Sequence, residues 1–420
     1  MSSSTTSITR RISDTTTTQL LKAANAKNSD SLEEQQKLLK ELEETFDYEG
    51  RVSVPSPDFR SGYVSVIGAP NMGKSTLVNA LLQEKLCIAT RRPQTTRHAI
   101  LGILTTRTCQ LCLLDTPGII DQPAYKLQEG MMEAVQGAFQ DADVLLIVTD
   151  LFSTPIPNDD LFLKVQQQQG KRPIIVVINK IDLANNVNIE KIRNEERRKK
   201  ESETENAENP LKTVTVPEAV ARWRQLLPEA LAIIPTSASE GPDDVGVTCL
   251  RRLLLGGPDV PAAIRDLGRP VPGMFLPAVK LISDEEAQAL LPPGPPLYQE
   301  EMFTDRTERF LASEMIRAAL LETFQKELPY CCEVLVTSFK EKPKDNPTLI
   351  AMDATICVER DSQKIIVVGK QGSKIKEVGI KAREALEEFF QTKVFLKLQV
   401  KVDKDWRKKE DRLKQYGYKK

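Results

Sequence analysis

Short apolar runs separated by polar loops make up much of the chain between residues 61 and 255. The clearest of them lie at 63–67, 100–104, 111–114, 173–178 and 233–234, and several end in a conspicuous polar motif. Uninterrupted apolar runs of this length are typical of strands buried on both faces, as in a mainly parallel sheet covered by helices. A helical pattern at 77–82 follows the first run and its loop. The pattern therefore predicts an α/β domain.

The chain from residue 298 onward has a different order of elements. Apolar residues at helical spacing predict a helix that Asp305 caps, with Glu308 returning the capping-box contact, and that Pro329 stops. Strand-like runs at 333–339 and 348–359, a short amphipathic segment, a helix at 373–390 and a strand at 394–400 follow. The order αββααβ, with Gly-x-x-Gly between the second and third helices, is that of a type II KH domain, an α+β fold.

Four segments fall outside these two patterns. Residues 1–30 begin with many Ser and Thr residues and predict a disordered, transit-type segment, for which an ordinary disordered tail is the alternative. Residues 31–60 contain an acidic helical pattern and a linker. Residues 186–215 predict a charged, disordered insertion, and residues 256–297 a Pro/Gly-rich, semi-rigid linker or insertion. The two domains are thereby placed at 61–255 and 298–420, the second with a basic C-terminal tail.

The charge of the chain is unevenly distributed, although its 420 residues carry a net charge of only −1. Residues 361–420 hold 17 Lys/Arg and 9 Asp/Glu, a balance of +8, so everything upstream sums to −9. The basic end is therefore the candidate surface for binding a polyanion. A hydrophobic fraction of 40% supports two cores, and no apolar stretch approaches transmembrane length, which predicts a soluble protein.

Cysteine and histidine usage disfavours several kinds of chemistry. The seven cysteines show no disulfide-scaffold spacing, and Cys109 and Cys112 point to opposite faces of a predicted strand. We interpret them as core residues in a reducing compartment, with no disulfide partner implied. The one histidine, His98, is expected in a loop. Ser–His or Cys–His catalysis and a histidine-built metal site are therefore disfavoured.

The loop after the first strand has the sequence of a phosphate-binding P-loop. It reads Gly68-Ala69-Pro70-Asn71-Met72-Gly73-Lys74-Ser75-Thr76 and opens directly into the predicted helix. Strand, glycine-bounded loop and helix N-terminus turn backbone N–H groups toward a polyphosphate, Lys74 neutralises the β and γ oxygens, and the Ser75 hydroxyl ligates Mg²⁺. A glycine-rich turn that binds nothing is the alternative, which the complete motif in its full context disfavours.

The tetrad Asn179-Lys180-Ile181-Asp182 predicts which base is bound. It ends the strand at 173–178, and the C-terminal edge of such a strand opens onto a ligand crevice. The Asp182 carboxylate accepts from N1–H and the exocyclic amine of guanine, whereas adenine offers the opposite pattern. Asn179 suits the O6/N7 edge, and the Lys180 stem lies along the ring. The run ending in Ser237 and Ala238 places its backbone beside the base. GTP or GDP is therefore predicted, which opposes an ATP-dependent small-molecule kinase.

Two further segments supply the switch-like parts of the site. Asp115-Thr116-Pro117-Gly118 follows the strand at 111–114, so Asp115 is predicted to hold Mg²⁺ through water and the Gly118 N–H to sense the γ-phosphate. In the polar loop 90–97, a hydroxyl from Thr95 or Thr96 completes the Mg²⁺ coordination, unless both are merely solvated. Ile119 stands where Ras-like switches place a water-orienting Gln, which predicts slow intrinsic hydrolysis.

The Gly-x-x-Gly turn of the second domain is surrounded by lysines. Its candidate RNA-binding residues are Lys364, Gly369, Lys370, Gln371, Gly372, Lys374 and Lys376. In KH domains such a turn clamps the backbone of a few single-stranded nucleotides. A helix–turn–helix corner is the alternative reading of the glycines alone, and the local positive charge favours RNA.

These motifs together resemble the Era family of translation GTPases. Besides the GTPase motifs, the resemblance rests on Thr304-Asp305-Arg306, on Glu327-Leu328-Pro329-Tyr330 and on the run 367–376, and it covers roughly 61–185, 231–240 and 298–420. It implies a Ras-like P-loop GTPase domain before the KH domain. It also implies that Thr96, rather than Thr95, is the switch ligand of Mg²⁺. By the same resemblance the Asn71 carbonyl could hold K⁺ against the phosphates, for which a simple turn residue is the alternative. Lys74, Asn71, Thr96 and Gly118 are then the catalytic set.

The resemblance also implies partners and a location. The partners are the 3′ region of small-subunit ribosomal RNA and the small ribosomal subunit, during ribosome assembly. The second function class is a GTP-dependent adaptor acting on other RNA or peripherally at a membrane, with hydrolysis incidental. The start of the chain and the run 58–63 look more like plastid than bacterial members of the family. This predicts the plastid stroma, with the mitochondrial matrix second.

Overall fold

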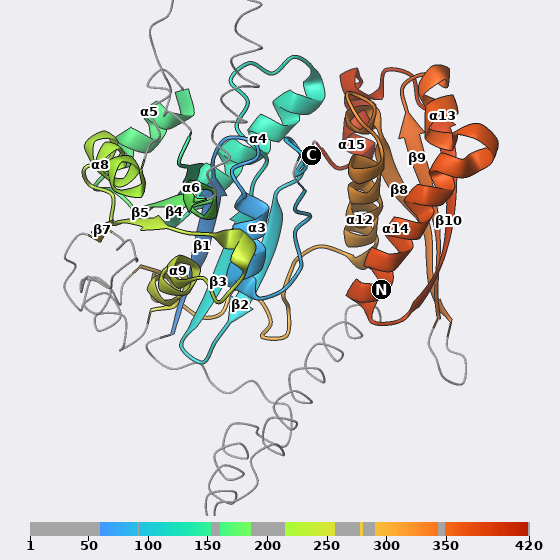
Figure 1. The fold of residues 1–420 in the computed structure, drawn as a ribbon. Helices are drawn as coiled ribbons and strands as arrows, with labels where there is room; N and C mark the ends of the chain where they lie inside the picture. Colours follow the sequence, from blue (N-terminus) through green and yellow to red (C-terminus); the bar gives the residue numbers. More distant parts are fainter. Residues whose placement is uncertain are drawn as a thin grey trace, which may run out of the picture.

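A computed structural model describes residues 59–90, 92–152, 160–185, 215–256, 278–279, 290–342 and 349–418. It has two halves that lie side by side, and the C-terminus is between them (Figure 1). The expectations for residues 1–58, and for the insertion at 186–214, lie outside the described residues. No helix in the described ranges is long and apolar enough to cross a membrane.

The first half contains a seven-stranded sheet in the order β2-β3-β1-β4-β5-β6-β7. Its strands are β1 (Arg60–Ile67), β2 (Ile100–Thr105), β3 (Cys109–Asp115), β4 (Val144–Asp150), β5 (Ile174–Asn179), β6 (Ala232–Pro235) and β7 (Ala278–Val279). The pairs from β3 to β6 are parallel, whereas the edge strands β2 and β7 run antiparallel. Parallel strands bring their C-terminal ends to one edge, which is where the polar motifs were predicted to meet.

Helices cover both faces of this sheet. They are α3 (Lys74–Leu82), α4 (Lys126–Asp141), α5 (Asp160–Gln167), α6 (Asp182–Asn185), α8 (Val216–Leu226) and α9 (Val245–Leu255), with a 3₁₀ turn η1 (Ala238–Glu240). Residues of α3 and α9 share one core with the sheet, and residues of α4, α5 and α8 share another. The strands are buried on both faces, which explains their uninterrupted apolar sequences.

The second half is a three-stranded sheet with helices, in the predicted order αββααβ. Its elements are α12 (Glu308–Thr323), η2 (Pro329–Cys331), β8 (Glu333–Lys342), β9 (Leu349–Val358), α13 (Asp361–Val368), η3 (Lys370–Gly372), α14 (Ser373–Phe390), β10 (Lys393–Val402), η4 (Trp406–Lys408) and α15 (Glu410–Gln415). Central β9 pairs parallel with β10 and antiparallel with β8. Helices α12, α14 and α15 lie on the side facing the first half (Figure 1).

The start of α12 differs from the sequence prediction. Thr307, not Asp305, is the N-cap, and its side chain accepts a hydrogen bond from the Phe310 backbone N–H at 3.3 Å. Asp305 instead forms an ion pair with Arg306 at 3.6 Å, one turn before the helix. Both residue types cap well, so the choice depended on where the chain leaves the first half and turns into the helix.

The proline-rich segment before the second half is not a free spacer. Leu290 and Leu291 are buried in the core of the first half, and the Ser61 N–H donates to Pro292 O at 3.1 Å. The fully buried Gln110 side chain accepts from the backbone N–H groups of Leu297 (2.7 Å) and Tyr298 (2.9 Å). The expectation of a semi-rigid linker at 256–297 is therefore wrong for residues 290–297, because these backbone contacts fasten them to the first half.

The basic C-terminal tail folds back between the two halves. Trp406 and Leu413 are completely buried and, with Tyr418, form a small core against Leu127 and Met131 of α4. Two of its arginines are engaged in ion pairs with carboxylates of the same half. The apolar side chains of the tail thus have a packing role, which charge counting did not reveal, whereas its lysines at 404, 408, 409 and 414 are exposed.

All seven cysteines are buried and free. Cys109 and Cys112 lie in β3, and burial raises the pKa of Cys112 to about 12. Both side chains are almost completely buried, and burial also raises the pKa of Cys109, so the CxxC spacing here has a packing role.

Candidate functional site

The P-loop lies between β1 and α3, with Gly73 at the N-cap in the left-handed region (φ +85°). A Cβ on Gly73 would lie 2.3 Å from Asn179 Nδ2, so this turn tolerates only glycine. The Lys74 ammonium is buried and donates to Gly68 O (3.0 Å) and Ala69 O (2.9 Å). Burial lowers the pKa of Lys74 to about 8, against the opposing attraction of Asp115. A polyphosphate beside this amine would favour its charged form.

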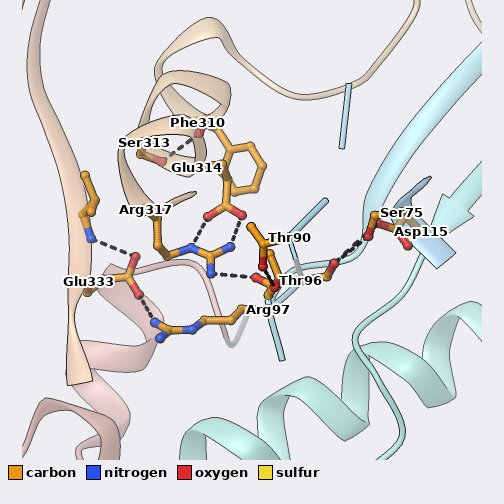
Figure 2. A network of polar contacts seen from close by, with 12 residues as sticks. Ser75, Thr90, Thr96, Arg97, Asp115, Phe310, Ser313, Glu314, Arg317 and Glu333 are labelled. Atoms are coloured by element: carbon orange, nitrogen blue, oxygen red, sulfur yellow. Dashed lines mark hydrogen bonds and ion pairs between the residues drawn. The ribbon is translucent and has the colours of Figure 1, made fainter. Parts of the chain in front are cut away.

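The three predicted Mg²⁺ ligands converge (Figure 2). The Ser75 hydroxyl donates to Asp115 Oδ2 at 2.6 Å and lies 2.9 Å from the Thr96 hydroxyl, which itself lies 3.5 Å from Asp115 Oδ2. Burial raises the pKa of Asp115, and its Oδ1 is buried without a hydrogen-bond partner. Two hydroxyls and a carboxylate with an unsatisfied oxygen are the hard ligands that Mg²⁺ prefers, so the residues fit this ion.

The hydroxyl next to Asp115 is that of Thr96. Thr95 Oγ1 lies 2.6 Å from Thr90 Oγ1 and donates to Arg92 O at 2.8 Å, inside the loop. The geometry therefore agrees with the family-based choice between the two threonines. One cleft is lined by the P-loop, by Gly118 and by the loop residues Ile88, Ala89, Thr90, Arg92, Gln94, Thr95 and Thr96.

Gly118 lies against the P-loop, since a Cβ there would be 2.7 Å from Pro70 Cα. The following N–H, of Ile119, donates to Gly68 O at 3.1 Å. The Ile119 side chain packs on the apolar cluster beneath α4 and α5. The position that carries a water-orienting Gln in Ras-like switches is thus occupied by a core-facing hydrocarbon.

The base-recognition motif lies at the C-terminal ends of β5 and β6. Asp182 Oδ1 accepts from the Ser237 hydroxyl at 2.8 Å, and no described residue donates to its Oδ2. Lys180 donates to Asn71 O and is 3.8 Å from Asp150 Oδ2. The residues that the sequence placed around guanine are therefore brought together at this edge.

Asn179 is used differently from the expectation. Its side chain is only 2% exposed; the amide donates to Met72 O at 3.0 Å, and its oxygen accepts from Ala238 N–H (3.0 Å) and Thr236 Oγ1 (3.2 Å). In this structure Asn179 thus connects the P-loop to the loop after β6, instead of presenting its amide to a base edge. The sequence motif does not distinguish these two uses.

The Gly-x-x-Gly turn connects α13 to α14 as the short 3₁₀ helix η3. Gly369 (φ +73°) and Gly372 (φ +77°) have left-handed backbone angles, and so does Gln371 (φ +52°). The four candidate lysines are exposed, and Ile365 and Ile366 beside them are 73% and 55% exposed. Apolar groups and ammonium groups at an open turn match the chemistry of an RNA clamp.

Comparison with known proteins identifies the family. A family model described as "50S ribosome-binding GTPase" matches residues 63–180, and one described as "KH domain" matches residues 327–407. The GTPase Era of Xylella fastidiosa is 35% identical over 361 residues, which cover 86% of this chain and 98% of that protein. The chain belongs to the Era family of GTPases. An Arabidopsis thaliana relative named "GTPase ERA-like, chloroplastic" is 32% identical over 365 residues, covering 87% of this chain and 70% of its own.

Solved Era structures share the fold of this Era-family GTPase. One, an Era complex with MgGDPNP and nucleotides 1506–1542 of 16S ribosomal RNA, is 29% identical with a TM-score of 0.63. Another, an Aquifex aeolicus Era variant bound to GDP and AlF₄⁻, is 30% identical with a TM-score of 0.64; in both cases 86% of this chain and 100% of that chain are covered. The predicted Ras-like P-loop GTPase domain followed by a KH domain is confirmed, and the protein binds GTP and GDP with Mg²⁺ and hydrolyses GTP.

Sequence reasoning missed one set of polar residues. Arg97, Glu314, Arg317, Glu333 and Tyr418 form a buried network between the loop carrying Thr96 and the KH domain. Of these residues, only Arg97 could have been noticed in the sequence, because it directly follows Thr96. The others come from positions more than 200 residues away, and no spacing rule connects them to the loop.

Proposed function

We propose that this Era-family GTPase binds small-subunit ribosomal RNA through its KH domain during ribosome assembly, under the control of GTP. The observation that carries the proposal is the presence, on one chain, of the converging Ser75–Thr96–Asp115 site and of an open, lysine-rich Gly-x-x-Gly turn. The RNA in the related Era complex, nucleotides 1506–1542 of 16S ribosomal RNA, supports this substrate class. The small ribosomal subunit is then the larger partner.

The geometry supports the following proposed roles. Lys74, at the first position of α3, binds the β and γ oxygens; Ser75, Thr96 and Asp115 hold the metal; and the Gly118 N–H, packed on the P-loop, binds the γ-phosphate. Mg²⁺, when bound, neutralises charge on the β and γ phosphates. Asp182 and the Ser237–Ala238 segment select guanine, and the Gly-x-x-Gly turn with its exposed lysines at 364, 370, 374 and 376 binds the RNA backbone.

Hydrolysis by the isolated protein is expected to be slow, because Ile119 offers no group to orient water. We also expect it to depend on potassium. Asn71 lies in the P-loop with its side chain exposed toward the cleft. In this proposal the side-chain carbonyl of Asn71 holds K⁺, which would supply positive charge at the transferred phosphate. Replacing KCl by NaCl at equal ionic strength should lower the turnover rate by about tenfold or more, since one preorganised positive group in a dry site is usually worth at least that.

The control for this prediction is Asn71→Gly. Asn71 has φ +64°, so glycine keeps the backbone unstrained while removing the side-chain carbonyl. The variant should be slow in either salt. A rate in NaCl equal to that in KCl, both with and without RNA, would show that potassium has no part.

We further propose that the protein works in a plastid, and there in the stroma. The chloroplastic relative from Arabidopsis thaliana supports the organelle, and the hydroxyl-rich, acid-poor start of the chain supports import. The mitochondrial matrix is the second candidate. The adaptor function would place the protein peripherally at a membrane instead.

Crosslinking the protein to RNA in isolated organelles, followed by sequencing of the bound RNA, tests the function and the location together. Reads should concentrate at the 3′ end of the small-subunit ribosomal RNA, and the protein should be recovered in the stromal fraction of plastids. Reads spread over other RNAs, with hydrolysis not required for release, would favour the adaptor function. Recovery with washed membranes would contradict the stromal location.

A further inference from the structure

Both chain neighbours of Thr96 are held by the KH domain (Figure 2). On one side, Arg317 of α12 donates from Nη1 to the backbone oxygen of Thr95 at 2.6 Å. On the other side, the Arg97 side chain leaves the GTPase domain and enters the KH domain. Thr96 itself points the opposite way, toward Ser75 and Asp115. The position of its hydroxyl is therefore determined from the second domain as well as the first.

The Arg97 guanidinium has four acceptors in the KH domain. It donates to three backbone oxygens, those of Pro329 (3.3 Å), Tyr330 (3.1 Å) and Cys332 (2.9 Å), and to Glu333 Oε2 (3.3 Å). Arg97 is 4% exposed. A guanidinium in so closed a pocket keeps one orientation, because moving it would leave a buried charge without partners.

The Arg317 guanidinium is equally constrained. It is completely buried, and two of its nitrogens donate to the Glu314 carboxylate one turn earlier in α12. Although burial alone favours the neutral acid, the Arg317 charge lowers the pKa of Glu314, so this is an ion pair at neutral pH. The pair orients the remaining guanidinium nitrogen toward Thr95 O.

Aromatic contacts complete the connection. His98 stacks on Tyr418 with ring centroids 4.2 Å apart and meets Phe310 edge-on at 5.2 Å. The Tyr418 hydroxyl donates to Glu333 Oε2 at 2.5 Å, so the C-terminal tail joins the same network. Burial lowers the pKa of His98 to about 4, and the ring is neutral in the physiological range. Residues 95, 97 and 98 thus all contact the KH domain or the tail that follows it.

We propose that Arg97 and Arg317 are positioning residues for GTP hydrolysis: by anchoring both sides of Thr96 to the KH domain, they set the hydroxyl that holds Mg²⁺ when GTP is bound. The inference rests on the proposed role of Thr96. A switch threonine acts on the triphosphate-bound state and not on the GDP state. The two arginines therefore raise the affinity for GTP over GDP, and any ligand that shifts α12 against the GTPase domain changes that ratio.

The test uses the full-length chain and two variants of the network. Glu314→Leu with Arg317→Met removes the ion pair as a unit, which avoids a lone buried charge. Arg97→Lys keeps a positive charge near Glu333, but the lysine ammonium cannot also donate to all three backbone oxygens. In both, affinity for a non-hydrolysable GTP analogue with Mg²⁺ should fall by roughly tenfold, the usual worth of a hydrogen bond to a charged group. Affinity for GDP should stay within about twofold of the unmodified protein.

Amide hydrogen exchange provides a readout independent of turnover. In the analogue-bound state, the peptide covering residues 92–98 should exchange faster in both variants than in the unmodified protein. Lys85→Ala is the matched control, because Lys85 pairs with Glu388 across the same two domains at the exposed surface and does not contact this loop. The control should leave both the affinity ratio and the exchange unchanged, since exposed ion pairs contribute little.

Thr96→Val separates failure of this inference from failure of the assigned site. If Thr96→Val lowers affinity for the GTP analogue but both network variants keep the normal ratio and exchange, the arginines do not position Thr96 and the proposal is wrong. If Thr96→Val itself changes nothing, the role of Thr96 is wrong and the positioning proposal falls with it. Should the double variant lose GDP binding, which would indicate misfolding, Arg97→Lys alone decides the matter.

Discussion

Replacing Asp182 by Asn is expected to convert the protein from a GTP-binding into an XTP-binding one. The amide can still accept from the Ser237 hydroxyl, as Asp182 Oδ1 does at 2.8 Å, so the local fold should persist. The new NH₂ group, however, faces the exocyclic amine of guanine, and two donors cannot form a hydrogen bond. The same NH₂ group can donate to the additional oxygen of xanthine. A mismatched hydrogen-bond pattern of this kind costs roughly 10⁴-fold in discrimination.

Dissociation constants for GTP, XTP and ATP, measured on the unmodified protein and the variant, check this result. Asp150→Asn is the matched control, since Asp150 is the other carboxylate near Lys180, at 3.8 Å, and it caps the following backbone through Oδ1. That variant should keep the preference for GTP. Equal affinity of the unmodified protein for ATP and GTP would overturn the guanine assignment.

Replacing Gly372 by Asp is expected to abolish tight RNA binding while leaving GTP binding intact. The change adds bulk and negative charge at the turn where a phosphate group must approach the backbone. A Cβ at this position meets only Ile375 Cγ2, at 3.9 Å, so the KH fold should accommodate it. Affinity for a single-stranded RNA taken from the 3′ end of small-subunit ribosomal RNA should fall by about 100-fold or more at fixed salt.

Gly170→Asp is the control for backbone strain in this experiment. Gly170 has nearly the same backbone angle (φ +74°) as Gly372 (φ +77°), has open space around it, and lies in the GTPase domain. Both variants bear the same cost of a left-handed aspartate, but only one carries its charge at the turn. Equal RNA affinity of the two variants, measured by titration, would show that the turn does not contact RNA. Gly369 is less suitable, because a Cβ there lies 2.9 Å from Lys374 N.

Each domain and its chemical motifs were predictable because they depend on local order. The strand at 63–67, the P-loop and the helix after it are contiguous, so backbone geometry alone sets the phosphate site. The helix at 373–390 was predicted to its final residue, since glycines and apolar spacing mark its ends. The meeting of Ser75, Asp115 and Asp182 at one edge follows from parallel strands, whose C-terminal ends must lie together.

Other features were decided by contacts between distant segments. Asp305 and Thr307 are both good helix caps, and only the path of the chain out of the GTPase domain selected Thr307. The sequence suggests a spacer over residues 256–297, yet the buried Gln110 side chain is hydrogen-bonded by the backbone of Leu297 and Tyr298 at its end. Such choices follow from the requirement that buried polar groups be paired, which acts between residues far apart in the sequence.

The sequence by itself determined that this protein binds a guanine nucleotide through a P-loop and carries a KH domain, because both properties reside in short, contiguous motifs. Only the tertiary structure decided how the two are joined. The carbonyl of Thr95 accepts a hydrogen bond from a residue 222 positions away, and the side chain of Arg97 donates to one 236 positions away. A buried charge must find its partner in space, and which partner lies within hydrogen-bonding distance is set by the docking of two domains, not by spacing along the chain.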